Sequence, residues 1–147
     1  MQNQFSILKF GVFFLIISGL TLFSCKTKSF TPDNFKGAQI VFGSGGGFTG
    51  AIDKFLILEN GQVFKSTKRK KTLEEKNRFK KKELTTIFEE CKTIMSSYDI
   101  MDEPGNLYYF ISYKNGDDIS RIVWGDDNQD PSPEVLDFYK KLQSLVQ

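Results

Sequence analysis

An almost wholly apolar run near the N-terminus decides how much of this chain is available to fold. Residues 10–23 read Phe-Gly-Val-Phe-Phe-Leu-Ile-Ile-Ser-Gly-Leu-Thr-Leu-Phe, and the single charged residue Lys9 precedes them. A helix that crosses the hydrocarbon core of a bilayer needs about 20 apolar residues, whereas the apolar core of a secretion signal is shorter. We therefore predict that residues 1–24 are an export signal, which leaves residues 25–147 for the mature protein.

The end of the apolar run carries a cleavage motif. Leu22-Phe23-Ser24-Cys25 resembles the lipobox of bacterial lipoproteins, with Leu three places before the cleaved bond, a small residue before it and Cys after it. Phe23 departs from the small residue that is more usual at the second place. The resemblance implies lipidation of the Cys25 sulfur, cleavage before Cys25 and acylation of its new amino group. Two or more acyl chains hold a protein stably on a membrane, whereas one holds it only marginally.

The residues after Cys25 bear on location. Lys26, rather than Asp, follows the cysteine, which resembles the pattern of lipoproteins sorted to the outer membrane. Residues 25–35 are mostly polar, and we interpret them as the lipid-modified cysteine and a short flexible tether. The expected location is thus the cell envelope, on the outer membrane and facing the periplasm.

Composition limits the function of the remaining residues. Residues 36–147 have the length of one domain, and a hydrophobic content of 39% for the whole chain is ordinary for a globular protein. The net charge of +2 gives no reason to expect a nucleic-acid partner. The chain has no histidine, which excludes a Ser-His-Asp triad, a Cys-His dyad and a histidine-ligated zinc. Cys91 has no disulfide partner if Cys25 carries lipid.

The first part of the domain has strand and helix patterns. Residues 39–42 and 51–58 are predicted strands, and Asn60-Gly61 predicts a hairpin turn with positive φ at both positions, followed by a return strand. A charge run over residues 65–83 follows, rich in Lys and Arg. Apolar residues at helical spacing then predict an amphipathic helix over roughly 82–96.

The second part repeats this order of elements. Residues 107–113 and 119–124 are predicted strands joined by a turn at Asn115-Gly116. Ser132-Pro133 predicts the start of a C-terminal helix, with Ser as the N-cap and Pro at the first helical position. We therefore expect an α+β domain: an antiparallel sheet of two hairpins with two amphipathic helices on one face.

A glycine-rich segment between the first two strands is the most unusual feature of the domain. It consists of Gly45, Gly46, Gly47, Phe48, Thr49 and Gly50. These residues satisfy the pattern G-x-G-x-x-G, but a dinucleotide site needs a helix after the pattern, and here a strand is predicted. Two interpretations remain: the glycines allow a bend between paired strands, or they present Phe48 and Thr49 to a partner. We expect the first, with Phe48 at least partly packed.

The same segment carries a resemblance to a family. Gly46-Gly47-Phe48-Thr49-Gly50, beside a strand and before an α+β body, resembles the Gly-Gly-Phe-x-Gly stretch of emfourin-type inhibitors of thermolysin-like proteases. The resemblance covers this motif and the approximate order of elements. It implies an inhibitor or another binding module, with the glycine segment as its binding loop.

The acidic segment after the last strand is a weaker candidate. Asp126, Asn128, Asp130 and Asp137 fall at positions of a calcium-binding loop, but Pro131 stands where that loop needs Gly. We therefore expect a solvated loop and no metal site. Cys91 lies on the apolar side of its predicted helix and is expected to be a core residue, not a nucleophile. Trp124 is likewise expected to be packed.

These observations lead to three hypotheses of different classes. The first is a non-enzymatic envelope lipoprotein that is held on the membrane by lipid on Cys25 and binds an unknown protein partner without a cofactor. The second is a protease inhibitor that acts through the glycine segment. The third, an enzyme that uses carboxylates alone, lacks a constellation that points to a reaction. The basic run of residues 65–83 is interpreted as a solvated loop and strand edge, with contact to anionic lipid as the alternative.

Overall fold

A computed structural model describes residues 30–67, 70–98, 101–126 and 129–147, which form a sheet with helices on it. The strands are β1 (Gln39–Gly46), β2 (Ala51–Leu58), β3 (Gln62–Thr67), β4 (Lys70–Arg78), β5 (Met101–Asp102), β6 (Leu107–Asn115) and β7 (Asp118–Trp124). The helices are α2 (Lys81–Ser97) and α3 (Pro133–Val146). Cys25 and the predicted signal lie outside the described residues. The α+β class predicted from the sequence is therefore observed.

The sheet is larger than the two hairpins expected from the sequence. Its seven strands lie in the order β4-β3-β2-β1-β6-β7-β5, and neighbouring strands are antiparallel except for the β5–β7 pair. The prediction missed the short strand β5 and also β4, which occupies the middle of the charge run. Its charges pair locally, with Lys76 on Glu74 at 2.7 Å and Arg78 on Glu75 at 2.9 Å. Charged side chains of this kind suit an edge strand, because they discourage pairing with another chain.

The turns differ in detail from the prediction. Gly61 has a φ of +101°, but Asn60 does not have a positive φ, so only one of the two expected positions is left-handed. In the second hairpin Asn115 pairs with Asp118, and the turn residues are Gly116 and Asp117, one place later than predicted.

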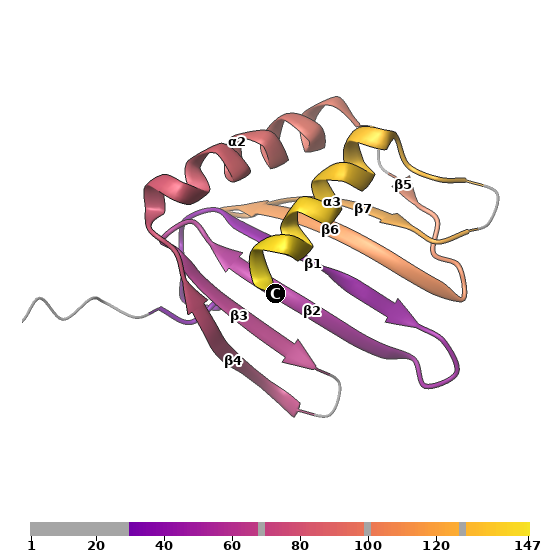
Figure 1. The fold of residues 1–147 in the computed structure, drawn as a ribbon, viewed down its shortest axis with the longest axis horizontal. Helices are drawn as coiled ribbons and strands as arrows, with labels where there is room; N and C mark the ends of the chain where they lie inside the picture. The colour runs from indigo at the N-terminus through magenta and orange to yellow at the C-terminus, as the bar shows by residue number, and fades with distance from the viewer. Residues whose placement is uncertain (1–29, 68–69, 99–100, 127–128) are drawn as a thin grey trace, which may run out of the picture.

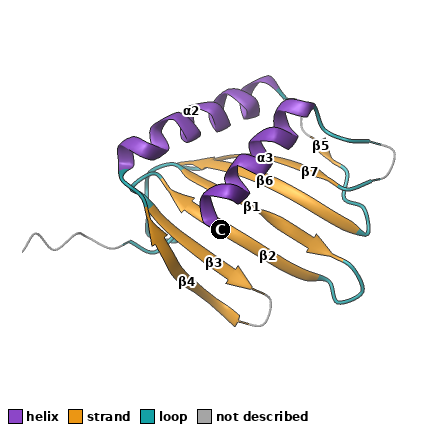
Figure 2. Cartoon of the chain, viewed as in Figure 1, coloured by secondary structure: helices purple, strands orange, loops and turns teal. Residues whose placement is uncertain are grey.

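Both helices lie on the same side of the sheet, as Figures 1 and 2 show. Helix α2 agrees with the predicted span within one residue at each end. Helix α3 begins at Pro133 after the N-cap Ser132, as predicted, although the Ser132 side chain makes no capping hydrogen bond. The main core lies between helices and sheet; its fully buried side chains include Phe42, Ile57, Ile111, Ile94 and Leu142.

A second, smaller core lies on the opposite face of the sheet. Leu56, Leu58 and Phe64 are buried there, and Phe30 and Phe35 pack against them. Residues 30–35, which the sequence assigns to the tether, are therefore docked on the sheet at its end near the β2–β3 turn.

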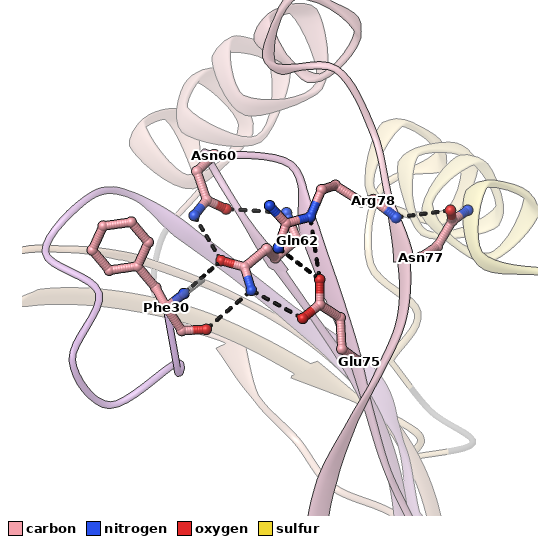
Figure 3. A network of polar contacts seen from close by, with 6 residues as sticks. All are labelled: Phe30, Asn60, Gln62, Glu75, Asn77 and Arg78. Carbon is pink, nitrogen blue, oxygen red and sulfur yellow. Dashed lines mark hydrogen bonds and ion pairs between the residues drawn. The ribbon is translucent and has the colours of Figure 1, made fainter. Parts of the chain in front are cut away.

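Two buried glutamines hold this docked segment. Gln39 and Gln62 are the buried polar side chains of the described residues. The Gln62 side chain accepts hydrogen bonds from the Phe30 N–H and the Asn60 amide, each at 2.9 Å, and donates to the Phe30 carbonyl at 3.0 Å and to Glu75 at 3.2 Å (Figure 3). Gln39 donates to the carbonyls of Pro32 and Phe35. The point at which the chain enters the domain is thus fixed to the sheet.

Candidate functional site

The glycine segment forms the end of the β1–β2 hairpin. Strand β1 ends at Gly46 and β2 begins at Ala51, so residues 47–50 connect them and form what we call the glycine loop. Gly46, Gly47 and Gly50 have φ values of +98°, +67° and +53°, which residues with a Cβ rarely adopt. The Gly50 N–H also donates to the Gly47 carbonyl at 2.9 Å. The glycines are therefore needed for the shape of the loop, as the bend interpretation required.

Phe48 behaves differently from our expectation. Its side chain was expected to be at least partly packed, but its relative exposure is 107%, so the ring contacts no part of the core. The physical reason is the tight turn: positive φ angles on both sides of Phe48 carry the chain around the end of the hairpin and direct this residue outward. A fully exposed Phe is unusual, since burying such a ring contributes roughly 1.5–3 kcal/mol. The expected packing of Phe48 is therefore wrong, because the loop leaves this side chain exposed.

The base of the loop is fixed by a neighbouring segment. The Gly47 N–H donates to the Asn106 carbonyl at 2.6 Å, and Gly46 pairs with Leu107 at the start of β6. A Cβ on Gly46 would lie 2.1 Å from the Asn106 carbonyl oxygen, which leaves room only for glycine. The loop therefore has a rigid base, although its apex is exposed.

A cleft lies beside this base. Its volume is about 760 Å³, and it is lined by Gly105, Asn106, Leu107, Tyr109, Trp124, Gly125, Asp126, Asp130 and Leu136. Tyr109 and Trp124 form an aromatic wall, with ring centroids 5.9 Å apart. Leu107 is 61% exposed and Tyr109 is 40% exposed, so the Tyr109 side of this wall is accessible, whereas Trp124 is almost fully buried. The cleft combines apolar and acidic side chains.

Backbone hydrogen bonds join the cleft and the loop into one surface. The Asp126 N–H donates to the Glu103 carbonyl at 3.3 Å, and the Glu103 N–H donates to the Val123 carbonyl at 3.1 Å. The chain then continues from Glu103 to Asn106, which supports the glycine loop. Residues 46–50, 103–107 and 123–126 therefore meet at the end of the sheet opposite to residues 30–35 (Figure 1).

The aromatic wall is supported from within the core. Tyr139 on α3 packs edge-on against Trp124, with ring centroids 5.2 Å apart, and its hydroxyl donates to the Gly43 carbonyl at 3.0 Å. Burial raises the pKa of Tyr139 to about 12, so the hydroxyl stays protonated and remains a donor at neutral pH. Trp124 is only 4% exposed, which confirms that it is packed while it forms part of the wall.

The remaining sequence candidates fall elsewhere. Cys91 is fully buried, and burial raises the pKa of its thiol to about 12, so it remains protonated at neutral pH. Within residues 30–67, 70–98, 101–126 and 129–147, no group of three or more His, Cys, Asp or Glu side chains could hold a metal ion. Of the predicted acidic loop, Asp126 and Asp130 line the cleft and Asn128 lies outside the described residues.

Sequence reasoning missed the cleft because its residues are distant in the chain. Leu107 and Tyr109 come from β6, and the register of β6 against β1 places them next to the glycine loop, whereas Leu136 comes from α3. The only signal for the cleft in the sequence was that the glycine segment and the turn at Glu103–Asn106 both precede strands that were predicted to join one sheet.

Within the part of the chain that the structure describes, no helix is long and apolar enough to cross a membrane. No protein-family model and no curated protein matches this chain.

Proposed function

We propose that this chain is an envelope lipoprotein whose domain binds a protein partner through the glycine loop, with Phe48 as the anchor. The observation that carries the proposal is the full exposure of Phe48 on a loop whose base is rigid. A protruding aromatic ring on a preorganised loop suits a concave apolar pocket, because little conformational entropy is lost on binding. An exposed anchor of this kind contributes to binding and not to folding.

The geometry of the domain supports this role for a lipid-anchored protein. Residues 30–35, through which the lipid on Cys25 would hold the domain, are docked at one end of the sheet by Gln39 and Gln62. The glycine loop lies at the other end (Figure 1). Strand β1, Gln39–Gly46, connects the two ends and is roughly 26 Å long at a rise of about 3.3 Å per residue. On the outer membrane, the loop would thus face the periplasm.

The partner class that we propose is an extracytoplasmic protease of the thermolysin-like type. The support is the resemblance of Gly46-Gly47-Phe48-Thr49-Gly50 to the emfourin-type stretch, together with the exposure of its Phe. An inhibitor needs a rigid element that enters a cleft and resists cleavage, and a hairpin whose loop glycines hold fixed φ angles has that property. The alternative is a non-inhibitory binding module that uses the same loop.

Two variants of the full chain in nonionic detergent test the proposal. Phe48→Ala should leave the melting temperature unchanged and weaken inhibition of thermolysin by about 30-fold or more, as the loss of an aromatic hot spot does. Ile119→Ala is the matched control, since Ile119 is an exposed apolar residue on β7 near the opposite end of the sheet. Equal activity of both variants would refute the role of the loop.

A crosslinking experiment separates the broad proposal from the narrow one. A photoreactive phenylalanine derivative placed at position 48 should crosslink one protein in intact cells, whereas the same group at position 119 should not. If position 48 crosslinks a protein that is not a protease, the inhibitor proposal fails and the binding module stands. If neither position crosslinks a protein, the loop is not a binding element.

A further inference from the structure

We infer that the cleft beside the glycine loop is a second contact site, and that it takes the cationic side chain of a Lys or Arg residue of the partner. This inference rests on the proposed function, because it assigns the cleft to the same partner as Phe48. Its support is the chemistry of the lining side chains and their connection to the loop.

The walls of the cleft suit an alkyl chain that ends in a cation. Leu107 and Leu136 provide aliphatic contacts, and Tyr109 provides an aromatic ring that is 40% exposed, with the packed Trp124 next to it. The stem of a Lys or Arg side chain is apolar and packs well on such surfaces. An ammonium or guanidinium group is also attracted to the faces of Tyr and Trp rings.

The charge of the cleft favours a cation. Asp126 and Asp130 are part of its lining, and no Lys or Arg stands among the lining residues that the structure describes. Asp102 and Glu103 are in the neighbouring segment, where the Glu103 carbonyl accepts from the Asp126 N–H, and Glu134 lies in the first turn of α3. A partner with a basic residue would therefore meet complementary charge, which increases the association rate and selects against acidic partners. An inorganic ion is a poorer fit, because a volume of about 760 Å³ with aromatic walls far exceeds the needs of one ion.

The cleft is connected rigidly to the loop. Asn106 lines the cleft, and its carbonyl accepts the hydrogen bond from the Gly47 N–H. A partner that seats Phe48 in a pocket would then place a neighbouring residue at a defined position above the cleft. Two contacts on one rigid surface fix the position of the partner relative to the domain, and they also add to its affinity.

The single Trp of the chain allows a direct test with small probes. Trp124 lines the cleft, so its fluorescence reports on occupancy. We expect Nα-acetyl-lysine amide or Nα-acetyl-arginine amide to change the Trp124 fluorescence of the full chain in detergent, with a dissociation constant on the order of 1 mM. Nα-acetyl-norleucine amide, which has a similar alkyl chain and no charge, should not bind. Equal effects of the norleucine and lysine probes would overturn the inference.

Two variants show whether the carboxylates of the cleft are responsible. Asp130→Asn should weaken binding of the cationic probe by at least threefold, whereas Asp118→Asn, at the β6–β7 turn near the opposite end of the sheet, should not change it. Equal loss in both variants would indicate a general charge effect and contradict the site. Phe48→Ala should bind the probe normally, so failure of the loop proposal and failure of the cleft proposal give different results.

A last probe distinguishes the source of the cation. n-Butylammonium carries the lysine side chain without a peptide group. If it bound at least tenfold more tightly than Nα-acetyl-lysine amide, the cleft would be a site for a free organic amine, and its assignment to a partner side chain would be wrong. Binding no tighter than that of the amide supports a polypeptide ligand.

Discussion

Replacing Gln62 with Leu should detach the N-terminal segment from the sheet and lower stability. Leu is close in volume to Gln, so the change removes hydrogen bonds without opening a large cavity. The Gln62 amide bonds to both backbone groups of Phe30, to Asn60 and to Glu75, at distances of 2.9–3.2 Å (Figure 3). Gln62 itself is fully buried, so water does not reach its amide in the folded protein.

The expected loss follows from the number of partners. Each hydrogen bond contributes about 1 kcal/mol net, and the partners of Gln62 are only partly buried, so water compensates some of the loss. We expect the free energy of unfolding to fall by about 2–3 kcal/mol. For a domain of this size, with a urea m-value of roughly 1.5 kcal/mol/M, the unfolding midpoint should fall by roughly 1–2 M.

Urea denaturation followed by circular dichroism measures this change in the full chain. Gln129→Leu is the matched control, because Gln129 is exposed and its loss should leave the midpoint unchanged. Hydrogen exchange gives an independent readout: the Phe30 amide should exchange faster in Gln62→Leu, since it loses an acceptor. A midpoint within about 0.3 M of the parent, with unchanged exchange at Phe30, would refute the role of Gln62 as a clamp.

Three further predictions concern residues of different function. Cys25→Ser should abolish lipid labelling and leave the precursor uncleaved, as mass spectrometry of the membrane fraction would show; normal maturation would contradict the lipoprotein proposal. Gly46→Ala should reduce the free energy of unfolding by about 2 kcal/mol or more, since its Cβ would meet the Asn106 carbonyl, whereas Gly116→Ala, with a φ of +63° but open space, should cost only about 1 kcal/mol; the reverse order in a denaturation experiment would rule out the clash. Cys91 in the mature protein should resist iodoacetamide at mildly alkaline pH and react once urea unfolds the domain, because its thiol is buried with a pKa of about 12; rapid labelling of the folded protein would show that the thiol is accessible.

Local sequence determined the elements whose pattern is strong. The apolar spacing of Leu84, Ile87, Phe88, Cys91 and Ile94 matches the face that α2 buries, because a period of 3.6 residues places them on one side of a helix. Ser132-Pro133 located the start of α3 for a similar reason: both residues have conformational preferences that act within one turn.

The missed strand shows the limit of such patterns. Strand β4 contains Lys, Glu and Asn with few apolar residues, so neither alternation nor burial marks it. It forms because β3 offers a free edge and because its charges can pair along the strand. Pairing of β4 with β3 depends on the presence of the sheet, and the residues of β4 alone do not specify it.

Sequence alone determined the α+β class and the glycine loop as the unusual segment, and it predicts an export signal before Cys25, since each of these depends on neighbouring residues. Only the tertiary structure determined that Phe48 is exposed on that loop and that a cleft lies next to it. The register of β1 against β6 places Gly46 on Leu107, and this pairing fixes the loop, leaves Phe48 exposed and brings the cleft of Tyr109, Trp124 and Asp130 next to it. Contacts between residues far apart in the chain depend on the packing of the whole sheet, which no local pattern contains.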